Sequence, residues 1–268
     1  MPAAILAGLA AALALAPLLA PADPAATDLA RSLEAASSAH PLGTDLLGRD
    51  LLARVLAGAR LSALVGLAAA ALGLVLGGGV GLLSAFAPPR VDALAMRAVD
   101  GLAALPTIVV SILLLAALGS SLGVLVLAIA LTEWFVPARV VRAEARRIRA
   151  REFVDAARNL GAGGPRLLLR HVLPHLAPTL AAALALTVPR AILAEAFLSF
   201  IGLGAAPPAV SLGGLLAEAV GSLDPVTRSA APLLAPTVAL ATVLVAVNAF
   251  SESLRPAAGL PSGKVSAR

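Results

Sequence analysis

The sequence has no cysteine and no tyrosine, and its only lysine is Lys264. Without cysteine, neither a disulfide framework nor a thiolate metal site can form. Val265 follows Lys264, so the chain contains no G-x-x-x-x-G-K-[ST] sequence, the loop with which ATPases bind phosphates. No Ser/His/Asp arrangement and no pair of carboxylates in a water-accessible domain is visible either. We therefore expect no catalytic residues, no resident metal and no cofactor bound by this chain.

Charge is also scarce, because only 13% of the 268 residues are charged whereas 60% are hydrophobic, and the mean hydropathy is +0.97. A soluble domain carries roughly a quarter charged residues. The composition therefore predicts an all-α, polytopic membrane protein that contacts lipid. The high pI, about 11.3, does not indicate nucleic-acid binding. The basic residues lie beside apolar runs, as the positive-inside rule predicts for cytoplasmic loops.

About six transmembrane helices are expected, since a span needs about 20 apolar residues. The expected spans are Met1–Ala22, Leu61–Pro89, two spans within Val99–Val141 on either side of a turn at Gly119–Gly123, Leu176–Leu203, and Ser229–Ser251. Arg90–Asp100 is expected to be a short connection between spans. Met1–Ala22 has a rival interpretation as a signal peptide, but it lacks the positively charged start of such peptides, so we expect a retained helix.

Glycine is concentrated in the second expected span. Small residues allow helices in a membrane to approach closely, so this span is expected to pack tightly against a neighbour. The residues concerned are Gly73, Gly77, Gly78, Gly79 and Gly81.

The polar interruption around which the chain is organised is Glu152–Pro174. Its pattern predicts a short helix over Glu152–Leu160, a left-handed helix end at Gly161, and a second helix that begins at Pro165 and is disturbed by Pro174. The first helix is expected to present a small apolar face formed by Phe153, Ala156, Ala157 and Leu160. Nine arginines lie between Arg139 and Arg170, which predicts that this stretch and both termini are cytoplasmic.

Three charged residues, Glu133, Arg190 and Glu195, fall within expected spans. A charge at that depth is costly unless it is paired or faces water, so each is a candidate for function or for structural pairing. Arg190 either pairs with Glu133 or lines a pathway. The spacing of His171 and His175 is typical of a metal-binding pair, but Pro174 is expected to break the helix between them. A metal site at His40, Asp45 and Asp50 is also weakly supported, because nothing in the sequence fixes the geometry of these residues.

Three motifs resemble those of the inner-membrane permeases of binding-protein-dependent ABC importers, in particular the peptide/nickel type. They are His40-Pro-Leu-Gly-Thr-Asp-Leu-Leu-Gly-Arg-Asp50, Asp155-Ala156-Ala157 with Gly161 and Leu173-Pro174, and Glu195-Ala-Phe-Leu-Ser-Phe-Ile-Gly-Leu-Gly204 followed by two prolines. The resemblance implies a type I importer fold. It assigns ATPase coupling to Glu152, Phe153, Asp155, Ala156, Ala157, Leu160, Gly161, Leu173 and Pro174. It assigns an extracytoplasmic motif to Gly43, Thr44, Asp45, Gly48, Arg49 and Asp50.

The same resemblance implies a function and a set of partners. The chain would be one permease subunit of an ATP-driven importer of di- or oligopeptides or nickel in the bacterial inner membrane. Its partners would be a homologous second permease, two cytoplasmic ATPase subunits that bind ATP and magnesium, and an extracytoplasmic substrate-binding protein. Three regions follow: residues 1–57 with the first span and the extracytoplasmic motif, residues 58–255 as the importer domain, and residues 256–268 as a cytoplasmic tail. The alternative is a proton-coupled secondary transporter using Glu133 or Glu195, although the internal repeat typical of such proteins is not found.

Overall fold

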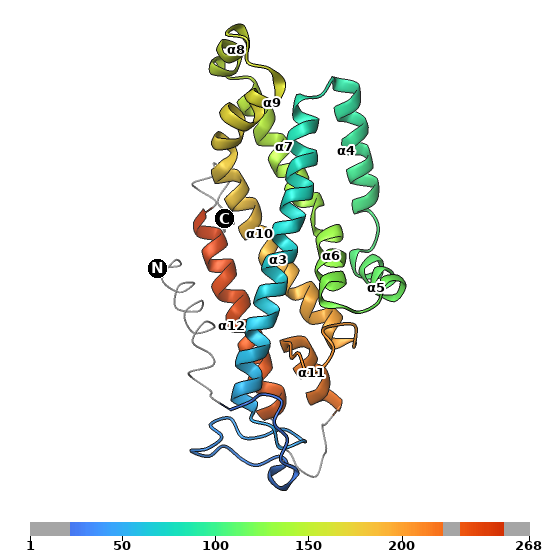
Figure 1. Ribbon diagram of the computed structural model, residues 1–268, viewed down its shortest axis with the longest axis vertical. Coiled ribbons are helices and arrows are strands. Elements are labelled where there is room, and N and C mark those ends of the chain that lie inside the picture. Colours follow the sequence, from blue (N-terminus) through green and yellow to red (C-terminus); the bar gives the residue numbers. More distant parts are fainter. Residues whose placement is uncertain (1–21, 222–230, 255–268) are drawn as a thin grey trace, which may run out of the picture.

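The computed structural model describes residues 22–221 and 231–254, and in these ranges every long element is a helix. The helices run mostly along one long axis, with α8 at one end and the segment before α3 at the other (Figure 1). The elements in chain order are η1 (Leu29–Arg31), α3 (Leu51–Phe86), α4 (Pro89–Ala103), α5 (Thr107–Leu118), α6 (Leu122–Glu133), α7 (Phe135–Arg149), α8 (Glu152–Asn159), α9 (Gly164–Arg166), the π-helical η2 (Leu167–Val172), α10 (Leu173–Phe200), α11 (Leu212–Gly221) and α12 (Ala231–Leu254).

Three helices are individually long and apolar enough to cross a membrane: Leu51–Phe86, Gly164–Phe200 and Ala231–Leu254. Two further crossings result if each bent pair is one span, α4 with α5 at 82° and α6 with α7 at 48°. The expected turn at Gly119–Gly123 lies between α5 and α6. The expected first span falls on residues 1–21, outside the described part, as does the tail from residue 255.

The expectation that Arg90–Asp100 is a short connection is wrong, because these residues belong to α4. Pro89 occupies the first turn of this helix, where its missing N–H costs nothing. Asp92 is buried and accepts hydrogen bonds from both Arg142 and Ser84, so packing against α7 and α3 stabilises a segment whose charges suggested a loop.

The expected break at Pro174 is also wrong, since one helix runs from Gly164 to Phe200. The six residues before α10 form a π-helical turn, in which the Leu173 N–H donates to the carbonyl of Leu168, five residues earlier. This wider turn accommodates a proline that lacks the N–H of a regular helix. As a result His175 lies one turn after His171, with 2.7 Å between its Nδ1 and the His171 carbonyl oxygen.

Helix α3 occupies the centre of the molecule and packs most extensively against α7 and α10 (Figure 1). The close approach expected from its glycines is confirmed at Gly77 and Gly81. A methyl group at Gly77 would overlap the carbonyl oxygen of Trp134, and one at Gly81 would overlap that of Ala138. Gly79, in contrast, faces open space.

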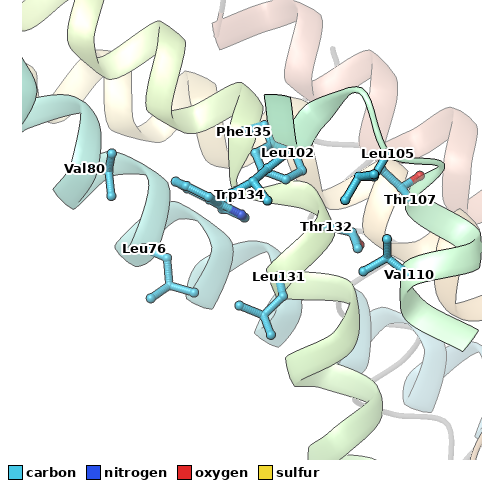
Figure 2. Close-up of a pocket in the computed structure, with 10 residues that line it drawn as sticks. All are labelled: Leu76, Val80, Leu102, Leu105, Thr107, Val110, Leu131, Thr132, Trp134 and Phe135. Atoms are coloured by element: carbon cyan, nitrogen blue, oxygen red, sulfur yellow. The ribbon is translucent and has the colours of Figure 1, made fainter. Parts of the chain in front are cut away.

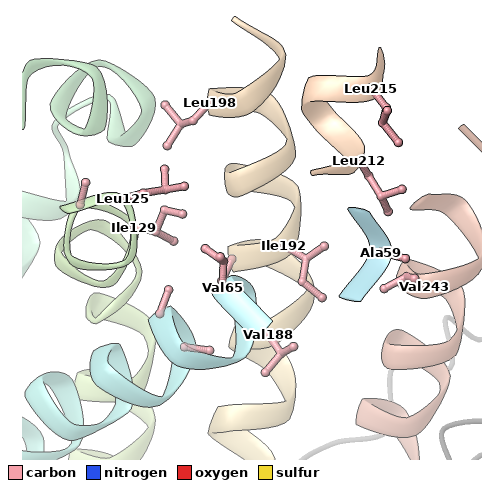
Figure 3. Close-up of a cluster of buried hydrophobic side chains, with 14 of the residues drawn as sticks. Ala59, Val65, Leu125, Ile129, Val188, Ile192, Leu198, Leu212, Leu215 and Val243 are labelled. Atoms are coloured by element: carbon pink, nitrogen blue, oxygen red, sulfur yellow. The ribbon is translucent and has the colours of Figure 1, made fainter. Parts of the chain in front are cut away.

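The largest apolar cluster lies where α3 and α10 meet α6, α11 and α12 (Figure 3). Val65 on α3 and Ile192 on α10 lie between Ile129 on α6 and Leu212 on α11. This packing holds the middle of α10 in place and therefore positions the charged residues that α10 carries.

Candidate functional site

The segment His40–Asp50 folds over the start of α3. Asp50 is the N-cap of that helix and accepts a hydrogen bond from the Ala53 N–H at 2.7 Å. The His40 Nδ1 lies 2.8 Å from the other oxygen of the same carboxylate. Gly43 and Gly48 have φ values of 78° and 69°, a region that residues with a side chain rarely adopt. The glycines of the motif are therefore required by the backbone.

A four-residue ionic network, formed by Asp45, Arg49, Arg54 and Glu218, attaches this segment to α3 and α11. The Arg49 Nε donates to Asp45 at 2.7 Å and its Nη2 donates to Glu218 at 2.8 Å. Arg54, whose side chain is only 2% exposed, donates to both oxygens of Glu218 at 2.7 and 3.0 Å and also contacts Asp45. Sequence reasoning missed Arg54 and Glu218, which are 164 residues apart and belong to no motif.

The pKa of Asp45 lies below its ordinary value of 3.8. Burial by itself would raise this pKa, but hydrogen bonds from the Arg49 backbone and side chain, together with the charges of Arg54 and Arg49, outweigh it. Because the pKa of Asp45 is lower in the folded than in the unfolded state, the ionised carboxylate stabilises the fold at pH values above the ordinary pKa of 3.8. This stabilisation is lost as the pH falls through the lower, folded-state pKa.

We accordingly expect the melting temperature of the purified chain to fall between about pH 5 and about pH 3, with part of this fall due to Asp45. In the variant Asp45→Asn the chain should be less stable at neutral pH, and its melting temperature should depend less on pH in this interval. Thermal unfolding in detergent at several pH values measures both. An identical pH dependence in the two proteins would contradict the assignment.

In the middle of the molecule, Glu133 and Arg190 form an ion pair, with 2.7 Å between the Arg190 Nε and the Glu133 Oε2. The predicted pairing of Arg190 with Glu133 is therefore present in the structure. The two partners differ in exposure, since the side chain of Glu133 is 7% exposed and that of Arg190 is 56% exposed. Pairing alone does not explain why the guanidinium lies at the surface.

The third charged residue, Glu195, is fully buried one helical turn before Ser199. The Ser199 hydroxyl donates to its Oε1 at 2.6 Å. Its Oε2 has no hydrogen-bond partner among the described residues. Glu195 does not contact Arg190 or Glu133 in the interactions found in this part of the chain, so the three predicted charges do not form one site.

A cavity of about 330 Å³ lies at the two breaks of the bent helix pairs (Figure 2). Its lining is almost entirely apolar and comes from α3, the end of α4, the start of α5 and both sides of Glu133. The lining residues are Leu76, Val80, Leu102, Leu105, Thr107, Val110, Leu131, Thr132, Trp134 and Phe135. Neither the bends nor the cavity was anticipated from the sequence.

The loop expected to contact an ATPase lies at the end of the molecule opposite to His40–Asp50 (Figure 1). Helix α8 ends as predicted, with Gly161 at φ 84°. The N–H of Gly161 donates to the carbonyl of Arg158, and that of Ala162 donates to the carbonyl of Ala157. This pair of bonds satisfies the last carbonyls of a helix that ends in a left-handed glycine.

The structure divides the predicted apolar face of α8. Ala157 is buried in the protein's own core, and the Phe153 ring stacks on His175 with 4.7 Å between ring centroids. Ala156 is exposed, and Leu160 is 89% exposed. The exposed surface of α8 therefore includes Ala156 and Leu160 beside the charged residues Glu152, Asp155 and Arg158. Phe153 and Ala157 hold α8 against the helices beneath it.

Leu173 and Pro174, the last two predicted coupling residues, lie at the start of α10 rather than in the loop. At the same end of the molecule, an unpredicted cluster of arginine contacts connects α7 to α3 and α4. Arg142 binds both oxygens of Asp92, at 2.5 and 2.7 Å, and Arg149 donates to the Ala85 carbonyl at 2.7 Å. Several of the arginines that indicated a cytoplasmic loop therefore also bind α3 and α4.

The described residues form an all-helical protein with three to five candidate membrane crossings, which is the architecture of a polytopic membrane protein. The family of binding-protein-dependent transport system inner membrane components matches residues 77–259, and the chain belongs to this family.

The chain is also similar to two relatives and to one solved structure. A putative peptide permease protein of Brucella suis is 39% identical over 241 residues, which are 90% of this chain and 80% of the relative. The oligopeptide transport system permease protein OppC of Bacillus subtilis is 38% identical over 208 residues, 78% of this chain and 68% of that protein. The fold is also that of a chain in the inward-facing MetNI methionine ABC transporter, with a TM-score of 0.57 at 18% identity, covering 76% of this chain and 96% of that one.

The comparisons confirm the resemblance seen in the sequence, the permease fold, and a multi-pass inner-membrane protein that acts as a transport subunit. A binding-protein-dependent ABC system includes ATPase and binding-protein partners in general. The roles of the individual residues, the three regions of the chain and the orientation of its termini stay predictions.

Proposed function

We propose that the chain is a permease subunit of a peptide importer and that it forms half of the translocation pathway together with a homologous second permease. The printed names of the two relatives, which refer to peptide and oligopeptide transport, support peptides as the substrate class. Neither name refers to nickel. Of the two substrates that the sequence suggested, we therefore retain peptides and do not propose nickel.

In this proposal the surface around α8 is cytoplasmic and contacts one of two ATPase subunits, which bind ATP and magnesium. The observation that carries the assignment is the construction of α8. Phe153, Val154 and Ala157 hold the helix on the protein's own core, whereas Ala156 and Leu160 remain uncovered. A helix that is fixed on one side and open on the other transmits the movement of a bound partner to α10.

The opposite end, with the segment His40–Asp50, is extracytoplasmic in this proposal and lies where a substrate-binding protein delivers its ligand. The positive-inside rule supports this orientation, since the arginines are concentrated near α7 and α8. The ionic network of Asp45, Arg49, Arg54 and Glu218 then stiffens the receiving surface by connecting the segment to α3 and α11.

The test is uptake of labelled tri-alanine by proteoliposomes that contain this chain with its second permease, ATPase subunits and binding protein. We expect uptake that requires ATP and the binding protein and that continues when an ionophore abolishes the proton gradient. Uptake driven by the proton gradient without ATP would instead support the secondary transporter. Labelled nickel ions serve as the control substrate, and their import in place of the peptide would contradict the proposal.

A further inference from the structure

The side chain of Arg190 is more than half exposed, and only its Nε has a hydrogen-bond partner among the described residues. The Glu133 carboxylate accepts a hydrogen bond from Nε, the guanidinium nitrogen that is nearest the backbone. For Nη1 and Nη2 there is no hydrogen-bond partner within residues 22–221 and 231–254. Because the Glu133 carboxylate is buried and the Arg190 side chain is 56% exposed, Glu133 holds the guanidinium from behind and leaves its two terminal nitrogens uncovered.

The depth of Arg190 determines what can lie in front of it. It is ten residues before Phe200, the last residue of α10, which corresponds to about 15 Å along a helix. The hydrocarbon core of a bilayer is about 30 Å thick, so a core that ends near Phe200 places Arg190 near its middle. A charged side chain at that depth faces a water-filled space or a polar partner, because contact with lipid tails is costly.

The neighbouring residues on the same side of α10 are also uncovered. Leu193 and Phe197 follow Arg190 at spacings of three and seven residues, which places them on one side of the helix, and both are exposed. Beside this stripe, the bent pair α6 and α7 breaks directly after Glu133. Discontinuous helices near the middle of the membrane are typical of substrate sites in transporters.

We propose that the stripe Arg190, Leu193 and Phe197 lines the translocation pathway and that the terminal nitrogens of Arg190 bind the carboxylate of the passing peptide. A guanidinium presents two parallel N–H groups that match the two oxygens of a carboxylate. The same positive charge repels a free divalent cation such as nickel. This inference rests on the proposed function and deepens it, because it assigns a selective group within the pathway.

The first experiment measures whether the stripe faces water and carries a positive potential. Because the native chain has no cysteine, Leu193→Cys introduces a single reactive thiol into this chain at an exposed position. In the assembled complex we expect this thiol to react with anionic and cationic methanethiosulfonates. When Arg190→Gln and Glu133→Gln are introduced together, the reaction rate with the anionic reagent, relative to the rate with the cationic reagent, should fall by about fivefold. The double change removes the cation without leaving a buried carboxylate unpaired.

The same thiol tests recognition of the carboxylate. Tri-alanine added directly to the complex should slow the labelling of Leu193→Cys, whereas tri-alanine amide at the same concentration should not. The difference should disappear in the Arg190→Gln, Glu133→Gln background and persist in Arg190→Lys. An unreactive thiol would mean that lipid or a carboxylate of the second permease covers Arg190. Equal protection by both peptides, or by neither, would also overturn the inference.

Uptake separates failure of this inference from failure of the proposed function. The wild-type complex should import tri-alanine, and the double variant should import about tenfold less for each ATP that it hydrolyses. Equal import by both complexes for each ATP hydrolysed would refute the role of Arg190 and leave the importer intact. Lack of import by the wild-type complex would refute the importer itself, while the labelling rates would still report on Arg190.

Discussion

Gly161→Val is expected to lower peptide import about tenfold while the chain still inserts into the membrane. Gly161 has a φ of 84° and no atom within 4 Å of the position of a Cβ, so the substitution strains the backbone without creating a steric clash. The left-handed conformation costs an ordinary residue roughly 1–2 kcal/mol, and more for a β-branched one, which favours a different path for the end of α8. The measurement is co-purification of the ATPase subunits together with ATP hydrolysis stimulated by the binding protein.

Gly163→Val is the matched control. Gly163 belongs to the same loop and also faces open space, but its φ of −66° suits any residue. Ala156→Arg tests the exposed surface of α8 and should weaken ATPase binding without affecting folding. Ala157→Arg would be ambiguous, because Ala157 is buried in the protein's own core. If Gly161→Val and Gly163→Val behave alike, the proposed coupling role of this loop is wrong.

Gly77→Ala should destabilise the protein strongly, by roughly 1–3 kcal/mol, because the new methyl group overlaps the carbonyl of Trp134, the residue just before α7. Helix α3 and α7 would have to separate, which would also displace Glu133, the neighbour of Trp134. Thermal unfolding in detergent and the yield of folded protein measure the effect.

Gly79→Ala is the control for this change, since Gly79 lies two residues away on the same helix and its Cβ position is open. Alanine has the higher helix propensity, so this variant should be as stable as the wild type or slightly more stable. Equal losses from both substitutions would show that glycine is needed in α3 for a reason other than contact with α7.

The sequence predicted the features that depend on neighbouring residues. The end of α8 at Gly161 was predicted from a glycine that follows apolar residues at helical spacing. The close packing of α3 was predicted from its high density of small residues. In each case a few adjacent residues determine the local conformation.

Features that depend on distant residues were not predictable in the same way. The charges of Arg90–Asp100 suggested a loop, but Asp92 is buried by arginines about 50 positions later. Pro174 suggested a helix end, but the π-helical turn before it accommodates the ring. The pairing of Arg54 with Glu218 joins α3 to α11, and no local pattern indicates which carboxylate an arginine will reach.

The continuous helix from Gly164 to Phe200 contains a π-helical turn and two internal prolines, and it connects the α8 end of the protein to the apolar cluster around Val65 and Ile192. Its 37 residues span about 55 Å. A rigid rod of this length that tilts by about 10° around its midpoint displaces each end by about 5 Å in opposite directions. Movement imposed at α8 would therefore open the space at one end of the rod while narrowing it at the other. The π-helical turn at Leu167–Val172 and the internal prolines Pro178 and Pro189 all lie between α8 and Arg190. Their combined stiffness would set how much of this movement reaches Arg190.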